Sequence, residues 1–485
     1  MSSKQLLLEA ASGSALPRLP VKIGLQTEGR QDLLNPMAAP PMSGLSLRSN
    51  FAWALSGNVV YAICQWGMIV VLAKLGSSFM IGQFSLGLAI ATPVLMFTNL
   101  HLRVVQASDA RRLYSFREYL QLRSVMTLGA IAVIGGIVCV EHYERQTAMV
   151  ILVVALAKGI ESLSDIHYGL FQLNDRLDQA GTSMMLRGTF SLLALSAGLY
   201  LTRDIFWACV GLALVWLAAL ILFDFRRGRR FVAFSEKCFQ LSSWKNLWHS
   251  ENRAKGFRRQ WNLMRLALPL GLVTTMASIN LNLPRYFIES QMGEHQLGIF
   301  SALAYATVAI TLVSDSLGHC AMPRMSRLYA RGQLTEFRSA LLQLLTIGGA
   351  LGLVGLAVAR IIGTRLLTMF YSREYAAASK VFIVLMIATA IHCVGGVLTS
   401  GIMSARCFRI QVPLFGLVLC SSALASWLLV PTSGLAGGAM AMVVGAVVRL
   451  LLAAAVVSYI FVVHAKGVAG LQAPHTQVDE WNSAL

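Results

Sequence analysis

Runs of about twenty apolar residues follow one another along most of the chain, separated by short polar segments. A helix of that length spans the hydrocarbon core of a bilayer, so each run predicts a membrane-crossing helix. The pattern predicts an all-α integral membrane protein with about twelve transmembrane helices. The predicted spans of the first half are 52–72, 83–102, 125–140, 148–173, 180–201 and 205–223. Those of the second half are 263–288, 297–321, 341–362, 376–403, 412–430 and 435–463.

The two halves carry the same helical hairpin. Gly82-Gln83-Phe84-Ser85, at the start of the second span, returns as Gly298-Ile299-Phe300-Ser301 at the start of the eighth. Arg112-Leu113-Tyr114 returns in the same way as Arg327-Leu328-Tyr329. A duplicated, strongly apolar chain is typical of a transporter built from two halves. We therefore expect two six-helix lobes related by an internal repeat.

One long connection separates these lobes. It is basic and aromatic, and it either lies along the anionic inner leaflet or is solvated; the sequence leaves both interpretations open. The proline-rich start of the chain has no apolar core and predicts a flexible tail. The predicted domains are an N-terminal cytoplasmic tail (1–45), an N-lobe (46–223), a basic cytoplasmic linker (224–262), a C-lobe (263–464) and a cytoplasmic C-terminal tail (465–485).

Composition supports the membrane prediction. Hydrophobic residues make up 56% of the 485 residues, charged residues only 13%, and the mean hydropathy is +0.64. Soluble domains carry about 25% charged residues. The net charge of +18 arises between the spans and not in one basic domain, so we do not expect nucleic-acid binding. The eight cysteines show no C-x-x-C motif and no zinc-ligand spacing, and we expect neither a metal nor a cofactor.

Positive charge alternates between the loops. The loops after the second, sixth, eighth and tenth spans are rich in arginine, and the intervening loops are short and mostly poor in base. Lys and Arg favour cytoplasmic loops, so the linker and both termini are expected in the cytoplasm. The loop between the ninth and tenth spans is an exception, because Arg365, Arg373 and Lys380 fall on the predicted outer side.

Charged residues inside the spans are the candidate functional groups, because a charge in a bilayer needs a partner or a watery cavity. Lys158, Glu161 and Asp165 lie on one face of the fourth span. Lys158 and Glu161 could neutralise each other at i and i+3, which would leave Asp165 unexplained. The eighth span carries Asp315. A carboxylate in a site of low dielectric constant binds and releases a proton at useful pH, so Glu161, Asp165 and Asp315 are the predicted ion-coupling residues.

Cations and amides in other spans are candidates for substrate contacts. Arg449 lies close to mid-membrane, where it either pairs with a carboxylate such as Asp315 or faces a substrate. Arg285 follows Pro284, which should kink or end its helix, and is either a snorkelling interfacial arginine or a cavity cation. The candidate substrate-binding residues are Lys158, Arg285, Arg449, Asn58, Gln65, Asn280 and Asn282.

No catalytic motif is present in the sequence. It contains no Walker loop, no G-x-S-x-G and no H-E-x-x-H. The predicted outer loops are too short to hold a catalytic domain. We therefore expect neither an enzyme nor an ATP-driven pump.

Several stretches resemble a known family. They are Ser49-Asn50-Phe51-Ala52-Trp53, Leu75-Gly76 with the first glycine turn, and Leu283-Pro284-Arg285-Tyr286-Phe287-Ile288 with the second. Together with the double six-span layout, they resemble the multidrug/oligosaccharidyl-lipid/polysaccharide flippase superfamily. Within it the chain is similar to the bacterial O-antigen and exopolysaccharide repeat-unit flippases, over residues 45–465.

The resemblance implies a V-shaped bundle of two lobes with a central cavity. Members of this family flip undecaprenyl-diphosphate-linked oligosaccharide repeat units across the bacterial inner membrane by alternating access, coupled to a proton or sodium gradient. The implied partners are the lipid-linked oligosaccharide, membrane lipids, and a polysaccharide polymerase with its chain-length machinery. In this scheme Lys158, Arg285 and Arg449 meet the diphosphate, which arginine binds through paired hydrogen bonds, and the amides face the sugars.

Two alternatives come from other classes. Cation-coupled multidrug or metabolite exporters share the fold, but they more often show an acid-lined pocket than a basic one. A membrane polymerase or ligase would need a large outer loop with paired acidic or basic residues, which the sequence lacks.

Overall fold

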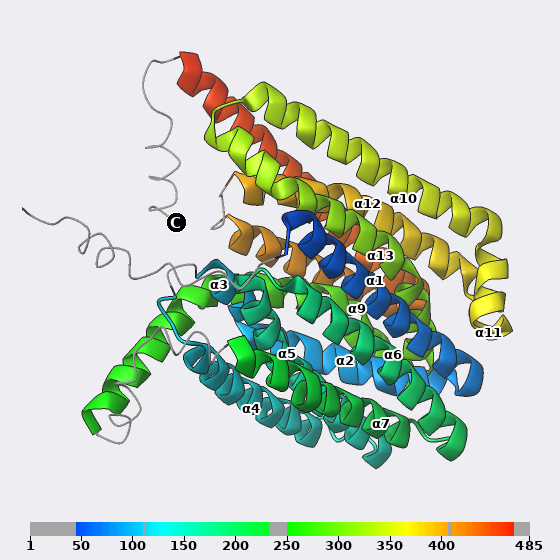
Figure 1. Cartoon of the computed structure of the whole chain (residues 1–485). Coiled ribbons are helices and arrows are strands. Elements are labelled where there is room, and N and C mark those ends of the chain that lie inside the picture. Colours follow the sequence, from blue (N-terminus) through cyan, green and yellow to red (C-terminus); the bar gives the residue numbers. More distant parts are fainter. Residues whose placement is uncertain (1–44, 110–111, 232–249, 406–409, 470–485) are drawn as a thin grey trace, which may run out of the picture. The chain divides into compact units, whose positions relative to one another are not determined.

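The computed structural model describes residues 45–109, 112–231, 250–405 and 410–469. Every element in this part of the chain is a helix, as the sequence predicts (Figure 1). The first half holds α1 (Leu47–Leu75), α2 (Ser78–Asn99), α3 (Leu102–Ser108), α4 (Phe116–Val140), α5 (Arg145–Leu173), α6 (Leu177–Thr202), α7 (Ile205–Ala218) and the π-helical turn η2 (Ala219–Phe225). The second half holds α9 (Ser250–Ala330), α10 (Leu334–Phe370), α11 (Arg373–Ala377), α12 (Ser379–Ser404) and α13 (Gln411–Ala469).

Polar side chains mark where several helices begin. The Ser115 hydroxyl accepts a hydrogen bond from the Glu118 N–H at 3.3 Å, and the Glu118 carboxylate accepts one from the Ser115 N–H at 2.8 Å. Ser46, Ser77 and Asp204 also accept a hydrogen bond from a backbone N–H of the first turn. These bonds satisfy donors that have no partner inside a helix, so the short polar segments of the sequence start the helices that follow them.

Two of the helices are broken by a glycine. Gly293 in α9 has φ 78° and ψ 177°, and Gly434 in α13 has φ 57° and ψ −132°. These are conformations that glycine adopts at low cost. A straight helix of 81 residues, the length of α9, would be about 120 Å long, whereas the hydrocarbon core is about 30 Å thick.

The two breaks reconcile the structure with the predicted spans. In the described part of the chain, ten helices are long and apolar enough to cross a membrane, and two of these are α9 and α13. The break in α9 lies between the predicted spans 263–288 and 297–321. The break in α13 lies between the predicted spans 412–430 and 435–463. The prediction of about twelve spans in an all-α membrane protein is therefore confirmed.

Pro284 does not end its helix, which leaves a kink as the remaining form of the sequence prediction. The helix of α9 continues through Pro284, and its first non-helical residue is Gly293. A proline removes one hydrogen bond, which neighbouring helices compensate for in a membrane bundle, whereas the glycine supplies a positive φ. The chain therefore turns at Gly293, five residues before Gly298 of the repeated motif.

Each half is assembled around one central helix. In the first half α5 packs against α2, α4 and α7, and Figure 1 shows α4, α5 and α7 side by side. In the second half α12 packs against α9, α10 and α13. The central helices carry small residues and methyl-bearing side chains on their buried faces, which lets neighbouring helices approach closely.

The glycines of the repeated motif, Gly82 and Gly298, make two equivalent contacts between the halves. A side-chain carbon on Gly82 of α2 would overlap the carbonyl oxygen of Glu294, and one on Gly298 would overlap the carbonyl oxygen of Ser78. Glu294 and Ser78 are each four residues before the glycine of their own copy, so the two contacts are equivalent in the repeat. We call this reciprocal contact the glycine crossing. It explains why both copies of the motif carry a glycine at this position.

The predicted boundaries of the linker differ from the observed helices. The helix of the sixth span runs to Phe231, and Asp224, placed at the start of the linker by its charge, is fully buried. At the other end, the last predicted linker residues already belong to α9. Residues 232–249 of the linker and nearly all of the predicted tails, 1–45 and 465–485, lie outside the described residues.

Candidate functional site

The charged face of α5 forms its first ion pair within the helix. The Lys158 Nζ lies 2.5 Å from the Glu161 Oε2, so the self-neutralising pair left open by the sequence is formed. The Tyr61 hydroxyl of α1 donates to the other Glu161 oxygen at 2.6 Å. Lys158 also lies over the ring of Trp216, 5.6 Å from its centroid. The Lys158 charge is therefore satisfied by the first half of the protein.

Asp165 lies between two arginines. Its carboxylate oxygens are 3.3 Å from Arg103 and 3.2 Å from Arg123, and the Arg123 side chain is fully buried. Arg123 and Thr127 of α4 also reach the hydroxyl of Ser162, at 3.4 Å and 3.3 Å. Asp165 thus joins α5 to α3 and α4, which answers the question that the sequence left about its partner.

Sequence reasoning missed the most deeply buried ion pair, which joins Arg187 of α6 to Asp224. Their atoms are 3.1 Å apart, with side-chain exposures of 1% and 0%. The Ser183 hydroxyl donates to Asp224 at 2.6 Å and is 2.9 Å from the Tyr168 hydroxyl. The sequence did contain an indication of this pair, because Arg187 is a charged residue inside the predicted span 180–201 and a charge there needs a partner.

The two candidate arginines of the second half have neutral hydrogen-bond partners. Arg285 donates to the Asn282 amide oxygen at 2.7 Å and lies over the Tyr305 ring at 5.6 Å. Arg449 lies 3.2 Å from the His392 Nδ1 and donates to the Thr399 hydroxyl at 3.3 Å. Among the described residues, neither arginine is in an ion pair.

Asp315 belongs to the same region as Arg449. A side-chain carbon on Gly396 of α12 would lie 3.6 Å from an Asp315 carboxylate oxygen, and Asp315 acts electrostatically on Arg449. The sequence hypothesis that these two residues pair stays a prediction. His392 lies beside the Arg449 guanidinium, on a third helix.

The four candidate amides fall into two groups. Asn58 and Gln65 are on α1, where Asn58 is exposed and donates to the Ala54 carbonyl at 2.7 Å. Asn282 is buried and donates to the Ser278 carbonyl at 2.9 Å. The amide oxygen of Asn280 is buried without a hydrogen-bond partner in the described part of the chain, and a side-chain carbon on Gly445 of α13 would lie 3.6 Å from it.

Each of the three predicted substrate cations is bonded to residues of the same half of the protein. Lys158 is bonded in the first half, and Arg285 and Arg449 are bonded in the second. Gly434 lies next to Met292, so the breaks of α9 and α13 are at one end of the bundle, which we call the Gly293 end. Helical rise places Arg285 about 12 Å, and Arg449 about 22 Å, from these breaks.

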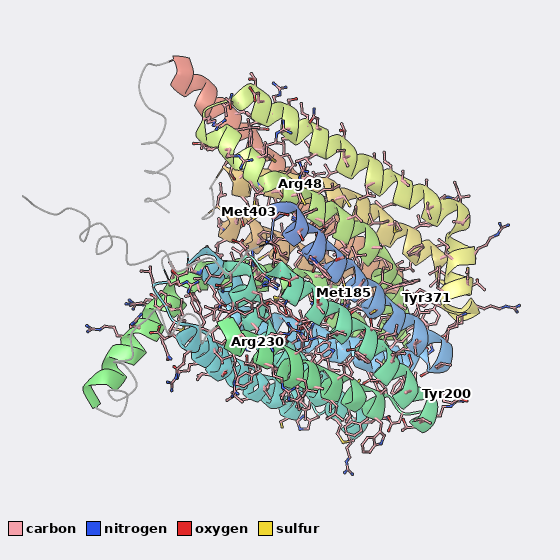
Figure 2. All side chains as sticks on the ribbon, in the orientation of Figure 1. Arg48, Met185, Tyr200, Arg230, Tyr371 and Met403 are labelled. Carbon is pink, nitrogen blue, oxygen red and sulfur yellow. The ribbon has the colours of Figure 1, made fainter. Side chains whose placement is uncertain are left out.

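One set of contacts between the halves lies at the Gly293 end. Besides the glycine crossing, the Trp66 Nε1 donates to the Tyr371 hydroxyl at 3.0 Å. The Ser78 hydroxyl donates to the Glu374 carboxylate at 3.0 Å. Figure 2 shows Tyr371 and Tyr200 toward one end of the molecule, with Arg48, Arg230 and Met403 toward the other.

A second set of contacts joins the opposite end of α9 to the first half. Arg259 forms an ion pair with Glu118 at 3.0 Å and donates to the Leu113 carbonyl at 2.7 Å. Between the two ends, the Tyr286 hydroxyl donates to the Ala89 carbonyl of α2. The first length of α9 therefore lies along the first half through the whole bundle.

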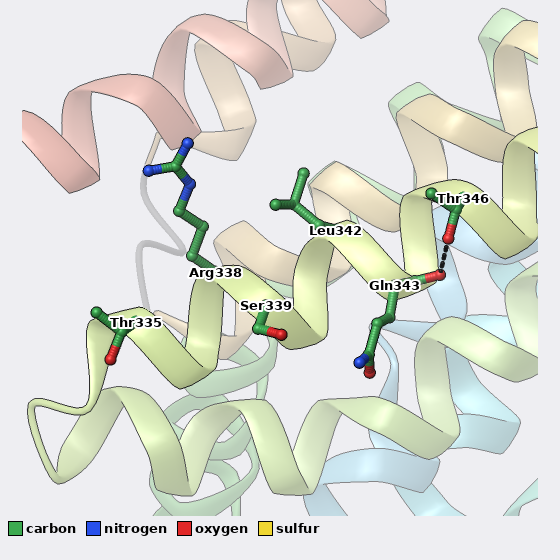
Figure 3. Close-up of a pocket in the computed structure, with 6 residues that line it drawn as sticks. All are labelled: Thr335, Arg338, Ser339, Leu342, Gln343 and Thr346. Atoms are coloured by element: carbon green, nitrogen blue, oxygen red, sulfur yellow. Dashed lines mark hydrogen bonds between the residues drawn. The ribbon is translucent and has the colours of Figure 1, made fainter.

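One pocket of about 390 Å³ lies on α10, away from all the candidate residues. Its lining residues come from a single helix, as Figure 3 shows, and are Thr335, Arg338, Ser339, Leu342, Gln343 and Thr346. They project from the face opposite the buried Phe337 and Leu341. The pocket is open, and it is not a site between the halves.

Apolar helices in a twofold repeat, with ion pairs buried among them, indicate a multi-pass membrane protein. The comparisons with known proteins agree with this class. No protein-family profile matches the chain. It is 25% identical over 403 residues to the capsular polysaccharide biosynthesis protein CapF of Staphylococcus aureus, covering 83% of this chain and 97% of that protein. It is 31% identical over 151 residues to the EPS I polysaccharide export inner membrane protein EpsE of Ralstonia solanacearum, covering 29% of this chain and 33% of that protein.

Solved structures identify the fold. The lipid II flippase MurJ in an inward closed conformation superposes with a TM-score of 0.59 at 13% identity, over 84% of this chain and 87% of that one. An inward-facing multidrug resistance MATE family transporter of the MOP superfamily gives 0.57 at 14% identity, over 88% and 97%. The resemblance to polysaccharide biosynthesis and export proteins is confirmed, and the fold is the one that these transporter and flippase structures share.

Proposed function

We propose that this protein flips oligosaccharide repeat units, linked to undecaprenyl diphosphate, from the inner to the outer leaflet of the bacterial inner membrane. The observation that carries the proposal is the similarity along nearly the whole length of a capsular polysaccharide biosynthesis protein. The fold of a lipid II flippase supports movement of a lipid-linked sugar. The partners in this proposal are the lipid-linked oligosaccharide, membrane lipids, a polymerase and its chain-length machinery.

The orientation in this proposal follows from the charged loops. The linker and both termini lie in the cytoplasm, because arginine-rich loops favour that side. The Gly293 end is then the outer end. The contacts between Trp66 and Tyr371, and between Ser78 and Glu374, hold the two halves together at this outer end.

The proposed diphosphate ligands are Arg285 and Arg449. Both guanidinium groups have neutral hydrogen-bond partners, but Asp315 also acts on Arg449, so Arg285 offers the more available charge to an anion entering between the halves. Lys158 remains a weaker candidate, because Glu161 already neutralises it. Asn280, with its unpartnered amide oxygen, is the strongest of the sugar-facing candidates, ahead of Asn58, Gln65 and Asn282.

Ion coupling is proposed for the intramembrane carboxylates. Glu161 of α5 is bonded to Tyr61 of α1. Asp165 of α5 is paired with two arginines, of α3 and α4. Protonation of either carboxylate would therefore change how these helices are joined. Asp315 of α9, whose carboxylate lies next to Gly396 of α12, is the third candidate. The driving gradient in this proposal is one of protons or sodium.

A cation-coupled drug exporter is the second candidate, because multidrug transporters share the fold. Exporters of cationic drugs need acidic groups that face the ligand. Here Glu161, Asp165 and Asp224 each bond to a lysine or arginine of the protein itself. This pairing favours an anionic substrate over a cationic one.

A strain that lacks this protein tests the proposed function in cells. We expect lipid-linked repeat units to be made but to collect on the inner leaflet, and surface polymer to be lost. Lipid extraction with sugar analysis, together with staining of the polymer, measures both. Normal polymer with increased sensitivity to cationic drugs would instead support the exporter.

A further inference from the structure

Four arginines crowd the end of the sixth span. The helix of that span runs from Ile205 to Phe231, and its last residues include Arg226, Arg227, Arg229 and Arg230. We call these four residues the arginine turn. All four are exposed, and Figure 2 shows Arg230 toward the end of the molecule opposite Tyr200. In the proposed orientation this is the cytoplasmic end.

The opposite face of the same helical segment is fixed to the protein. Asp224 is fully buried in its ion pair. A side-chain carbon on Gly228 would lie 2.8 Å from the His167 ring. The ring of Phe231 packs against that of Phe171, with 5.6 Å between their centroids. Because positions 224, 228 and 231 share one helix face, the four arginines project from the other face of an anchored segment.

No acidic residue in the described part of the chain neutralises the arginine turn. Asp224 is the one acidic residue of the helix 205–231, and Arg187 already pairs with it. Among the described residues, none of the four arginines forms an ion pair. The positive charge of the turn is therefore available to an anion from outside the chain.

Two of the four guanidinium groups rest on aromatic rings. Arg227 lies over the Phe223 ring, 5.4 Å from its centroid. Arg229 lies over the Phe225 ring at 4.5 Å. A ring against the flat face of a guanidinium holds the group in place and leaves the N–H donors along its edge free for an acceptor.

Exposed apolar side chains lead directly to the arginine turn. Leu214, Ile221 and Leu222 of the same helix are exposed, as expected for residues that contact lipid tails. Arg226 follows Leu222 by one helical turn, or about 6 Å. This change from apolar to basic marks the border between hydrocarbon and headgroups, so the arginine turn lies at the level of the lipid phosphates.

The geometry points to the arginine turn as a binding site for the headgroups of anionic phospholipids. A phosphate accepts paired hydrogen bonds from a guanidinium and carries the opposite charge. Four or more basic residues directly cytoplasmic of a span are typical of anionic-lipid recognition. The sequence left open whether the linker lies along the inner leaflet or in solvent, and this inference places its first helical turn on the leaflet.

A bound headgroup stabilises the end of the helix that holds Asp224. Like charges three and four residues apart on a helix repel each other, as Arg226 does with Arg229 and Arg230. A phosphate between them offsets that repulsion and favours the helical turn. The bound lipid is not the transported molecule, so the inference goes beyond the proposed function and does not depend on it.

A reporter among the neighbouring lipids tests this site. A fluorophore on Leu222→Cys, in a background without other cysteines, faces the lipids that border the arginine turn. The protein is reconstituted in phosphatidylcholine vesicles that contain the same fraction of brominated phosphatidylglycerol or of brominated phosphatidylcholine, and bromine quenches the fluorophore on contact. We expect phosphatidylglycerol to occupy this position about three- to tenfold more readily than phosphatidylcholine.

Three sets of substitutions show whether the arginines are responsible. The combined variant Arg226→Gln, Arg227→Gln, Arg229→Gln and Arg230→Gln should bring the ratio close to one. Lysine at the same four positions keeps the charge without the paired hydrogen bonds, so it should retain part of the preference if the turn is folded. The matched control replaces three exposed arginines at the end of α9 and just beyond it, and should keep the wild-type ratio; its substitutions are Arg324→Gln, Arg327→Gln and Arg331→Gln.

Three results separate the possible outcomes. Equal quenching by the two brominated lipids, or a preference that survives in the glutamine variant, contradicts the lipid site and leaves the proposed flippase untouched. Displacement of brominated phosphatidylglycerol by undecaprenyl diphosphate, but not by unlabelled phosphatidylglycerol, also contradicts it and assigns the turn to the substrate. A preference for phosphatidylglycerol in a protein that moves no lipid-linked oligosaccharide supports the lipid site and contradicts the proposed function alone.

Discussion

Arg187→Ala is expected to destabilise the protein by about 3–5 kcal/mol, because it leaves the Asp224 carboxylate buried without its cation. The Arg187–Asp224 distance is 3.1 Å and neither side chain is measurably open to solvent. The Ser183 hydroxyl would remain as a hydrogen-bond donor to that carboxylate. Arg187 also lies over the rings of Tyr168 and Trp216, so the truncation removes packing as well as charge.

Thermal unfolding of the purified protein measures this loss. Arg230→Ala is the matched control, since Arg230 is an exposed arginine beyond the same ion pair in sequence, and its effect should stay within about 0.5 kcal/mol. The double variant Arg187→Met with Asp224→Leu should recover much of the stability, because it removes both buried charges. Equal stability of Arg187→Ala and Arg230→Ala would show that the pair does not hold α6 to the end of the sixth span.

Arg285→Ala and Arg449→Ala should each reduce flipping of the lipid-linked oligosaccharide roughly tenfold to a hundredfold. A hydrogen bond to a charged group contributes about 1.5–3 kcal/mol, and a diphosphate in a bilayer has no water to replace it. Arg285→Lys should recover only part of the activity, since an ammonium cannot form the paired hydrogen bonds of a guanidinium.

Initial flipping rates in proteoliposomes measure the effect of these substitutions. Arg360→Ala is the control, because Arg360 is an exposed arginine on α10, outside the proposed site. Unimpaired flipping by the combined Arg285→Ala and Arg449→Ala variant would exclude these residues as diphosphate ligands. The flippase assignment would survive that result, because it rests on the relatives and the fold.

The sequence predicted the helices and their number because membrane spans follow from a simple physical requirement. A backbone in hydrocarbon must satisfy its hydrogen bonds internally, so every long apolar run becomes a helix. The repeated glycine motif likewise predicted where the copies correspond, and the structure places Gly82 and Gly298 in reciprocal contact. The predicted spans 263–288 and 297–321 also placed the break in α9, and the structure puts it at Gly293.

The polar interior was only partly predictable, because charges in a bilayer are paired across helices that lie far apart in the sequence. Lys158 and Glu161 are neighbours on one helix, so their pairing could be anticipated. The partners of Asp165 come from α3 and α4, and the partner of Arg187 comes from the far end of the sixth span. Such pairs require knowledge of how the helices pack, which the pattern of a single sequence does not contain.

Movement of a sugar lipid across a sealed bilayer is the most direct test of the central claim. The purified protein is reconstituted into vesicles that contain an oligosaccharide linked to undecaprenyl diphosphate, and a sugar-binding lectin added outside detects the molecules on the outer leaflet. The account predicts that these molecules appear faster than in protein-free vesicles and faster than with the combined Arg285→Ala and Arg449→Ala variant. An appearance rate equal to that of protein-free vesicles, together with transport of an organic cation by the same preparation, would contradict it.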